Sequence, residues 1–310
     1  MTQANQTIKK RSWVTQLKNQ KYLFFLLIPA VLITLIFKYF PMYGILLAFK
    51  DYNPMQGIAG SPWAGLKHFR DFLSSPNFGT LLGNSLKLSI TGLIFGFFPP
   101  IIIALMLNQV ISKKIKSTLQ TILYMPNFIS TVIIVGIIFL LFASSGPIIS
   151  ILHTMGIEAP NFLTDPSSFR PLYIISGIWQ GMGWASLLYT AVLSGIAPEL
   201  YEAADIDGAS ILQKIFYIEL PTMKPLITIN LILSIGGIMN IGYEKAYLMQ
   251  TSLNLPASEI IDTYVYKVGL QAGDYSYSTA VGLFNTAVNL ILLVTTTIIV
   301  NRMNRRKAVA

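Results

Sequence analysis

Few residues of this chain could carry out covalent or metal chemistry. The sequence has no cysteine and two histidines, His68 and His153, which lie far apart along the chain. Disulfides, iron–sulfur clusters and thiolate zinc sites are therefore excluded, and an imidazole metal site is not expected. The chain also lacks a Gly-x4-Gly-Lys-Ser/Thr phosphate-binding loop. The residues of interest are therefore those that could bind other molecules.

The segment 197–224 has the most specific residue pattern. Pro198 suits the first turn of a helix, and the acidic side chains of Glu199 and Glu202 favour its positive N-terminal end. Gly208 fits a left-handed position that ends the helix, where residues with a Cβ are strained. A short helix followed by a tight turn is therefore expected.

A second short helix is expected directly after this turn. Ser210 is suited to cap its first turn, and Pro221 is expected to end it. The small residues Ala203, Ala204 and Gly208 leave a compact surface that another protein can approach closely. The segment is therefore predicted to be a contact site for a partner protein.

The composition indicates the kind of fold that must position this segment. Of 310 residues, 53% are hydrophobic and 11% are charged, and the mean hydropathy is +0.60. An ordinary soluble domain has about 25% charged residues. So few charges cannot cover the surface of a soluble fold of this length, and the net charge of +9 is not arranged as a nucleic-acid surface. The chain is predicted to be an all-α membrane protein with several spans.

Six apolar stretches can each supply the roughly 20 residues that a helix needs to cross a bilayer. The third stretch contains Ser144-Ser-Gly-Pro147, a turn signal, so this span is expected to end near Ala143. The predicted spans are Tyr22–Phe49 (interrupted by Lys38), Leu88–Ser112, Ser117–Ala143, Pro171–Pro198, Pro225–Tyr243 and Tyr275–Asn301.

The distribution of basic residues predicts the orientation of these spans. Lysine and arginine gather before the first span, between the second and third, in the segment 197–224, and after the last span. By the positive-inside rule, both termini are expected in the cytoplasm. The chain then divides into a cytoplasmic N-terminal segment (1–21), a six-helix transmembrane domain (22–301) and a basic cytoplasmic tail (302–310).

The segment 197–224 resembles the EAA loop of the permease subunits of binding-protein-dependent ABC importers. The matching residues are Glu202-Ala203-Ala204, then Gly208, then Ile218-x-Leu220-Pro221. Three other segments are similar to sugar permeases: Phe49-x-Asp51-Tyr52-Asn53, Trp63-x-Gly65-Leu66 and Asn161–Pro166. Two more, Asp262–Tyr266 and Tyr275–Leu283, are closer still to the polysaccharide or complex-oligosaccharide permease subfamily.

This resemblance implies a type I ABC importer permease fold with six transmembrane helices in a bacterial cell membrane. In the family, the EAA loop is a coupling helix that docks in a groove on the ATPase subunit. By position, Glu202 would pair with a basic residue of the ATPase, Ala203 and Ala204 would pack in the groove, and Gly208 would make the bend. Asp207 belongs to the Asp-Gly-Ala form that is common in carbohydrate importers.

The resemblance also implies the partners of the chain. It would form half of the pathway for an oligosaccharide or polysaccharide fragment, which an extracellular solute-binding protein delivers. A second, homologous permease subunit would complete the pathway. The chain itself would bind no cofactor, because ATP and Mg²⁺ belong to a separate ABC ATPase dimer. The remaining partner is the lipid bilayer, and no nucleic acid is expected.

Five residues are candidates for the substrate pathway, because aromatic faces and planar polar groups recognise sugars. Trp179 and Trp184 lie in the fourth predicted span, and Asn240, Tyr243 and Glu244 lie at the end of the fifth. The alternatives are tryptophans at the membrane interface or in helix packing, and a solvated start of the outer loop at Glu244.

Two further expectations concern packing and exposure, and two concern alternative functions. Gly177 and Gly181 have the spacing of small residues at a helix contact. His68 and His153 are expected to be solvated in outer loops. An ion-coupled secondary transporter of a small polar solute is the alternative function, but it would need ionisable residues inside the spans. An integral-membrane enzyme is disfavoured because no nucleophile–base pair is apparent.

Overall fold

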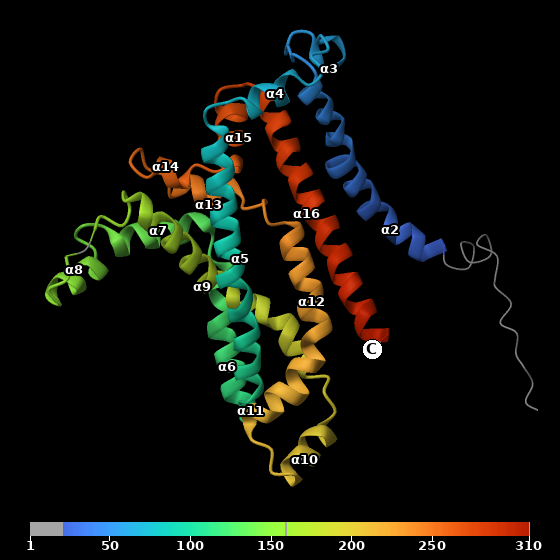
Figure 1. Cartoon of the computed structure of the whole chain (residues 1–310), viewed down its shortest axis with the longest axis vertical. Coiled ribbons are helices and arrows are strands. Elements are labelled where there is room, and N and C mark those ends of the chain that lie inside the picture. The colour runs from blue at the N-terminus through green and yellow to red at the C-terminus, as the bar shows by residue number, and fades with distance from the viewer. Residues whose placement is uncertain (1–20, 159, 310) are drawn as a thin grey trace, which may run out of the picture.

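The computed structural model describes residues 21–158 and 160–309. Over these residues the fold is helical, and extended pairing is limited to one isolated bridge between Lys50 and Trp63. The long helices run along one axis, with α10 at one end of the molecule and α3 and α4 at the other (Figure 1). The segment 1–20, which holds nearly all of the predicted N-terminal cytoplasmic segment, lies outside the described residues.

The first half of the chain contains three long helical stretches, and a loop with short helices lies between the first two. The helix that begins at α2 continues through a π-helical turn, η1, and a 3-10 segment, η2, and the short helices α3 and α4 follow it. The elements are α2 (Lys21–Thr34), η1 (Leu35–Tyr39), η2 (Phe40–Phe49), α3 (Gly57–Gly60), α4 (Lys67–Leu73) and α5 (Phe78–Asn108). Further on come α6 (Lys113–Tyr124), η3 (Met125–Phe128), α7 (Thr131–Phe142) and α8 (Pro147–Thr154).

The second half begins with the 28-residue helix α9 (Pro166–Leu193). Next come α10 (Pro198–Ile206), α11 (Ile211–Lys214), η4 (Ile215–Glu219) and α12 (Leu220–Gly236). The outer segment holds α13 (Tyr243–Leu248), α14 (Leu255–Ser258), α15 (Ile261–Tyr266) and η5 (Lys267–Gln271). The last helix, α16 (Tyr275–Val309), continues without interruption into the predicted tail.

Five helical stretches in the described part of the chain are long and apolar enough to cross a membrane. They are Phe25–Phe49, Phe78–Asn108, Thr131–Thr154, Ile211–Gly236 and Tyr275–Val300. The fourth predicted span, Pro171–Pro198, overlaps α9, which begins at Pro166 and ends at Leu193 and has the necessary length. However, its glycine, glutamine and tyrosine residues make α9 less apolar than the other five stretches. The count of six spans and the cytoplasmic termini remain predictions.

The start of the predicted third span needs correction. The helix of the predicted third span begins at Lys113 rather than Ser117, because Ser112 caps its first turn. This span then bends through η3 at Met125–Phe128, where Pro126 lies near the start of a 3-10 turn. The predicted turn before Pro147 is confirmed, since α7 ends at Phe142 and α8 begins at Pro147.

The predicted fifth span, Pro225–Tyr243, was wrong at both ends. Pro221 does not end a helix, because it lies in the first turn of α12, and the chain is helical from Ile211 to Gly236 through the π-helical turn η4. A proline is tolerated there because its missing N–H falls in a distorted turn. The helix ends at Gly236, and residues 237–242 connect α12 to α13 without regular structure.

The connection 237–242 is held by polar side chains from α16. Asn289 Oδ1 accepts a hydrogen bond from the backbone N–H of Met239 (2.9 Å), and Asn285 Nδ2 donates to the Met239 carbonyl (3.2 Å). Met239 is itself 1% exposed. These bonds replace the helical ones that the backbone loses here, which a buried segment requires. A helix break at this depth is therefore a stable feature of the fold.

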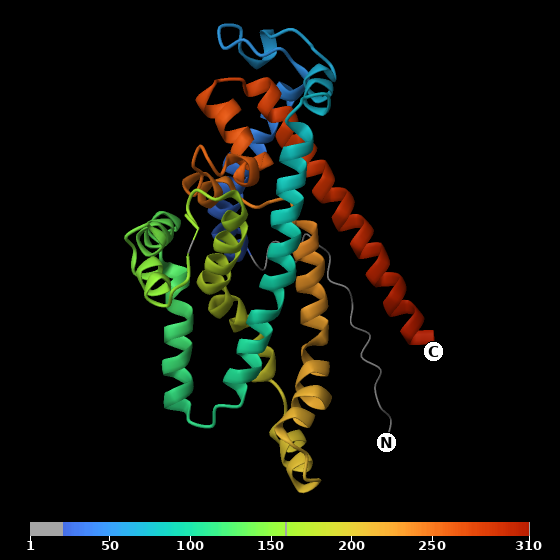
Figure 2. The ribbon, with the colours of Figure 1, turned by 60° about the vertical axis from the view of Figure 1, so that its left-hand side comes forward.

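Helices α5 and α9 pack along each other and form the centre of the fold (Figure 2). Their buried apolar residues join those of neighbouring helices in two clusters. Leu88, Ile134 and Phe169 belong to the outer one, and Ile101, Tyr189 and Met223 to the inner one. Many large apolar side chains of α2, η2, α7 and α16 are instead exposed, as expected for helices that face lipid.

The close helix contact was predicted at the wrong glycines. A Cβ at Gly181 would meet no atom within 4 Å, and one at Gly177 would meet only the end of the Lys245 side chain. A Cβ at Gly183 would overlap the backbone carbonyl of Leu123 on α6. Gly183 is therefore the residue that allows α6 and α9 to approach closely, and sequence spacing alone did not indicate it.

His68 was also predicted wrongly as a solvated residue, whereas His153 is exposed as predicted. His68 is 7% exposed, and its Nε2 lies 3.1 Å from both the Lys50 carbonyl and Asp51 Oδ1. Lys67 Nζ also contacts Asp51 Oδ1 at 3.0 Å, and this contact lowers the pKa of the Asp51 carboxyl. The outer loop is therefore folded around Asp51 rather than extended into solvent.

Candidate functional site

The segment 197–224 forms a helical hairpin at one end of the molecule. Helix α10 begins with Pro198 in its first turn, as the sequence predicted, and carries Glu199 there. Gly208 follows with φ of +74°, which confirms the left-handed turn. Ser210 caps α11 in a reciprocal capping box with Gln213. Each of these local features follows from residues within a few positions of it.

The residues with predicted coupling roles lie on the exposed side of this hairpin. Glu202, Ala203, Asp207 and Gly208 are exposed, and Ala204 is half-buried. A Cβ at Gly208 would meet no atom within 4 Å. Within this chain, position 208 therefore favours glycine because of its positive φ angle, and not because a larger side chain would lack space.

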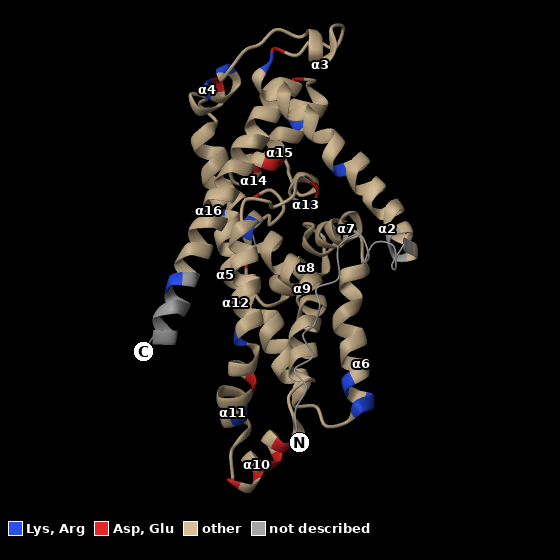
Figure 3. Ribbon diagram, turned by 90° about the vertical axis from the view of Figure 1, so that its right-hand side faces the viewer, with Lys and Arg blue, Asp and Glu red and all other residues tan. Residues whose placement is uncertain are grey.

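Helix α10 also exposes apolar side chains. Ile206 is 87% exposed and Leu200 is 53% exposed, and α10 has no buried residue. The acidic residues of α10 lie at the end of the molecule that the hairpin forms, and lysines lie at the start of α6 (Figure 3). A short helix with exposed apolar residues beside acidic ones has the composition of a surface that another protein covers.

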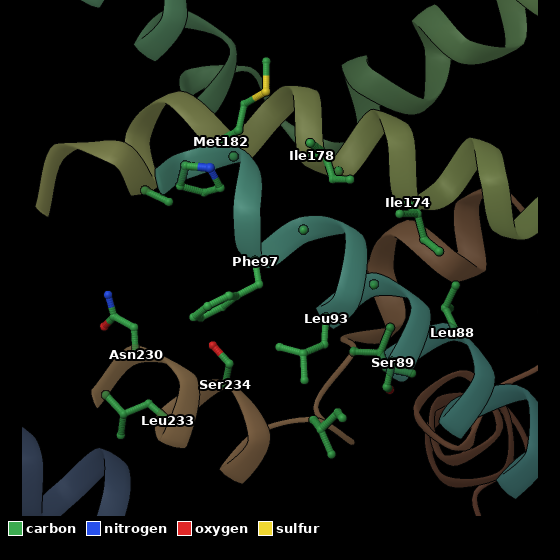
Figure 4. Close-up of a pocket in the computed structure, with 18 of the residues that line it drawn as sticks. Leu88, Ser89, Leu93, Phe97, Ile174, Ile178, Met182, Asn230, Leu233 and Ser234 are labelled. Atoms are coloured by element: carbon green, nitrogen blue, oxygen red, sulfur yellow. The ribbon is translucent and has the colours of Figure 1, made fainter. Parts of the chain in front are cut away.

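A cavity of about 610 Å³ lies between α5, α9 and α12. Figure 4 shows side chains from all three helices around it: Leu93 and Phe97 from α5, Ile178 from α9, and Asn230 and Ser234 from α12. Its other lining residues include Ser89, Gly177, Gly181, Met182, Tyr189 and Ile241. No Asp, Glu, Lys, Arg or His lines the described part of this cavity. The cavity is apolar with a few neutral polar groups.

The two candidate tryptophans do not line this cavity. Trp184 packs edge-on against Phe128 and Tyr124, with ring centres 5.5 and 6.4 Å away. Trp179 is partly exposed on the same helix. Neither tryptophan is among the lining residues of the cavity, and the ring of Trp184 is instead packed against aromatic residues of α6 and η3.

Tyr243 instead lines a second cavity of about 630 Å³ near the outer end of α16. Its ring stacks on Tyr266 with centres 4.4 Å apart and planes 12° apart. Tyr275, Asp262 and Thr279 are also among the lining residues. Aromatic rings beside a carboxylate and hydroxyl groups can bind sugar rings. Sequence reasoning found Tyr243 but not its partners, which come from segments distant in sequence.

Asn240 and Glu244 flank Tyr243 but have different surroundings. Asn240 Oδ1 accepts a hydrogen bond from Asn289 Nδ2 (2.8 Å), so this side chain helps to hold the break in the helix. Glu244 is exposed at the start of α13. Ile238 and Ile241 line the first cavity, whereas Gly242 and Tyr243 line the second. The break between α12 and α13 therefore borders both cavities.

Asp262 fixes the outer end of this break. Its Oδ2 accepts a hydrogen bond from the Gly242 N–H (2.8 Å), and its Oδ1 accepts one from Asn285 Nδ2 (3.2 Å). Burial raises the pKa of the Asp262 carboxyl, while the backbone bonds from Gly242 and Ile241 act in the opposite direction. Gly242 has φ of +81°, which a residue with a Cβ adopts only with strain.

The family of the chain follows from sequence comparison. Residues 92–307 match the family described as "Binding-protein-dependent transport system inner membrane component", and the chain belongs to this family. It is a multi-pass permease subunit of an ABC importer in the bacterial cell membrane, and not an ATP-hydrolysing enzyme.

Two curated relatives cover nearly the whole chain. Protein LplB of Bacillus subtilis (strain 168) is 44% identical over 283 residues, covering 91% of this chain and 89% of that protein. The polygalacturonan/rhamnogalacturonan transport system permease protein YteP of the same organism is 44% identical over 286 residues, covering 92% and 89%.

Solved structures agree with this fold. A chain from the crystal structure of a bacterial ABC transporter involved in import of the acidic polysaccharide alginate superposes with a TM-score of 0.83. It is 38% identical, and the match covers 94% of this chain and 98% of that chain. A second structure, of a bacterial alginate ABC transporter with its periplasmic protein bound to alginate pentasaccharide, also gives 0.83 at 37% identity, covering 96% and 98%.

Proposed function

We propose that this chain forms half of the pathway by which an ATP-driven importer takes up an oligosaccharide or polysaccharide fragment. A second, homologous permease subunit would form the other half, and an extracellular solute-binding protein would deliver the substrate. The names of its relatives support a polysaccharide-derived substrate, since they include a polygalacturonan/rhamnogalacturonan permease and an alginate importer.

The observation that carries this proposal is the exposed hairpin around α10. Its sequence matches the EAA loop, its backbone turns at Gly208, and its apolar residues Leu200 and Ile206 are exposed. A groove on the ABC ATPase is the proposed occupant of this surface. Glu202 and Asp207 are then available to contact basic residues of the ATPase at the rim of that groove, where such pairs set orientation.

ATP and Mg²⁺ belong to this partner in the proposed complex. The chain contains no phosphate-binding loop. In its described part no group of three or more His, Asp or Glu residues is placed to hold a metal ion. The contribution of this chain is therefore mechanical: it binds the ATPase through α10 and changes the access of its cavities to the two sides of the membrane.

The substrate would pass the helix break between α12 and α13. Tyr243, with Tyr266 and Asp262, offers stacking and hydrogen-bonding groups at the outer cavity. Asn230, Ser234 and Ser89 offer neutral polar groups in the inner one. Trp179, Trp184, Asn240 and Glu244 stay candidates for contacts that form in the assembled pair of permeases.

An ion-coupled secondary transporter is disfavoured by the chemistry of the inner cavity. Coupling to a proton or sodium ion requires ionisable groups along the path inside the membrane. The described lining of that cavity is apolar apart from serine, asparagine and tyrosine. This composition suits a pathway without ionisable groups, whose energy comes from another subunit.

The test of this proposal uses the complete importer in proteoliposomes. The chain, its sister permease, the ATPase and the binding protein are co-expressed, and ATP hydrolysis is measured with and without oligogalacturonides. Glu202→Ala should abolish most of the stimulation by substrate, whereas Glu199→Ala, an equally exposed acid in the first turn of α10, should retain it. Equal stimulation in both variants would contradict the proposed docking surface.

A further inference from the structure

A buried carboxylate lies between the α10 hairpin and the transmembrane helices. Glu219 is 0% exposed and ends the π-helical turn η4, directly before α12. The EAA pattern leaves this position unspecified, between Ile218 and Leu220. A charged side chain without solvent is costly unless its environment compensates for it. The contacts of Glu219 therefore indicate what it does.

Glu219 is held by three neutral donors from two other helices. Its Oε1 accepts hydrogen bonds from Asn108 Nδ2 (2.7 Å) and Gln109 Nε2 (2.9 Å) at the end of α5. The third bond comes from the hydroxyl of Tyr201 on α10 (3.2 Å). Asn108 Nδ2 also donates to the Tyr201 oxygen (3.1 Å). We call Glu219, Tyr201, Asn108 and Gln109 the Glu219 node.

The Glu219 node contains no basic residue. None of the ion pairs among the described residues includes Glu219, and its Oε2 is buried without a hydrogen-bond partner. A group that served packing alone would be replaced at little cost by an apolar residue. Here, the hydrogen bonds from α5 and α10 meet at one atom, Glu219 Oε1, directly before α12. Because hydrogen bonds are directional, they define the relative positions of these three helices rather than add much stability.

The position of the node connects the docking surface to the cavity. Tyr201 directly precedes Glu202, and its half-buried side chain points back to the bundle while Glu202 is exposed. Asn108 ends α5, and the same helix lines the cavity from Leu88 to Pro100. Since α10 has no buried residue, few other contacts can carry its movement to α5.

From this arrangement we propose that the Glu219 node passes the movement of α10 to α5, and through α5 to the wall of the cavity. The proposal rests on the proposed coupling role of α10. Glu219, Tyr201 and Asn108 act as positioning residues, because they contact neither substrate nor nucleotide. The coupling helix would then act on the membrane helices through two routes: chain continuity with α9 and α12, and the side chains of this node with α5.

A distance measurement in the assembled importer tests this proposal. The chain has no cysteine, so spin labels can be placed without background from this chain at Met106→Cys on α5 and Leu290→Cys on α16, both exposed. The change in distance between them is measured by pulsed electron paramagnetic resonance on adding the ATP analogue AMP-PNP with Mg²⁺. In the parent complex this addition should shift the distance distribution.

Two node variants and one control separate the outcomes. Tyr201→Phe and Asn108→Ala should each reduce the nucleotide-induced shift to less than half, and the double variant should be no worse than the stronger single one, as expected of one connected unit. Tyr217→Phe removes a hydroxyl from an exposed tyrosine of η4 and should keep the full shift. Co-purification with the ATPase verifies that each complex assembles.

The possible failures are distinguishable. A parent complex without any nucleotide-induced shift would contradict the proposed function itself. A normal shift in the parent and in both node variants would overturn the role of the node and leave the importer assignment intact. Equal loss in Tyr217→Phe would also overturn it, because the effect would then not depend on the hydrogen bonds of Glu219.

Discussion

Lys245 Nζ donates a hydrogen bond to the Tyr173 carbonyl (2.9 Å) and lies 4.7 Å from the centre of the same residue's ring. The two residues join α13 to the outer half of α9, next to the cavity wall at Gly177. Burial lowers the pKa of the Lys245 ammonium to about 8 from its ordinary 10.5. None of the ion pairs in the described part of the chain includes Lys245. The contact is therefore sensitive to pH.

The first prediction concerns this pH dependence. Between pH 8 and 10.5 the unfolded chain holds a proton on Lys245 that the folded chain has released, so this group's contribution to stability rises with pH over that range. Below pH 8 the full cost of burying the ammonium is present. The stability of the parent relative to Lys245→Met should therefore rise from about pH 7 to about pH 10.

Thermal unfolding of the purified complex at these two pH values measures the effect. The difference in Tm between the parent and Lys245→Met should change with pH. Lys224→Met, which removes an exposed amine from α12, should give a difference that stays constant. A constant difference for Lys245→Met as well would show that its ammonium is not desolvated.

The second prediction concerns the turn at Gly208. Because φ is +74°, Gly208→Ala should cost about 1 kcal/mol in the hairpin even though its Cβ has open space. Gly195→Ala, in the turn before α10, is the control because its φ is not positive and its Cβ meets only ordinary contact. Stimulation of the ATPase by loaded binding protein should fall in the first variant and persist in the second. Equal stimulation in the two variants would show that stimulation of the ATPase does not depend on the left-handed turn at Gly208.

The third prediction concerns the aromatic candidates. Tyr243→Ala removes a stacking face from the outer cavity, so the KM for uptake of the transported oligosaccharide should rise several-fold while the complex still assembles. Trp184→Ala, whose ring packs on Phe128 and Tyr124, should instead lower the Tm more than it changes KM. A larger effect of Trp184→Ala on KM would place this tryptophan in the pathway of the assembled importer.

The fourth prediction concerns topology. Reporter fusions after Lys307 and within 112–117 should be cytoplasmic, whereas fusions near Gly60 and Asp165 should be extracellular. The basic residues that precede α6 and end α16 favour the cytoplasmic side. A cytoplasmic reporter at Asp165 would mean that α6 to α7 do not cross the membrane, and it would contradict the six-span arrangement.

The sequence by itself determined the class of the protein and the local geometry of the hairpin around α10. Composition and long uncharged stretches required a helical membrane protein, because lipid cannot satisfy exposed backbone groups. Pro198, Gly208 and Ser210 act through residues within a few positions, so the start of α10, the left-handed turn and the cap at Ser210 were predicted before any tertiary contact was known.

Only the tertiary structure decided which side chains share a site. Glu219 contacts Asn108, which lies more than a hundred positions away in the sequence. Asn289 holds the backbone of Met239 in the break after α12, where the apolar sequence had predicted a continuous helix as far as Tyr243. The side of α9 that lines the cavity was likewise fixed by its neighbours: Gly181 faces the cavity and Gly183 contacts α6. Such pairings depend on how helices distant in sequence pack, and the residue types along one helix are compatible with several arrangements until the neighbouring helices are in place.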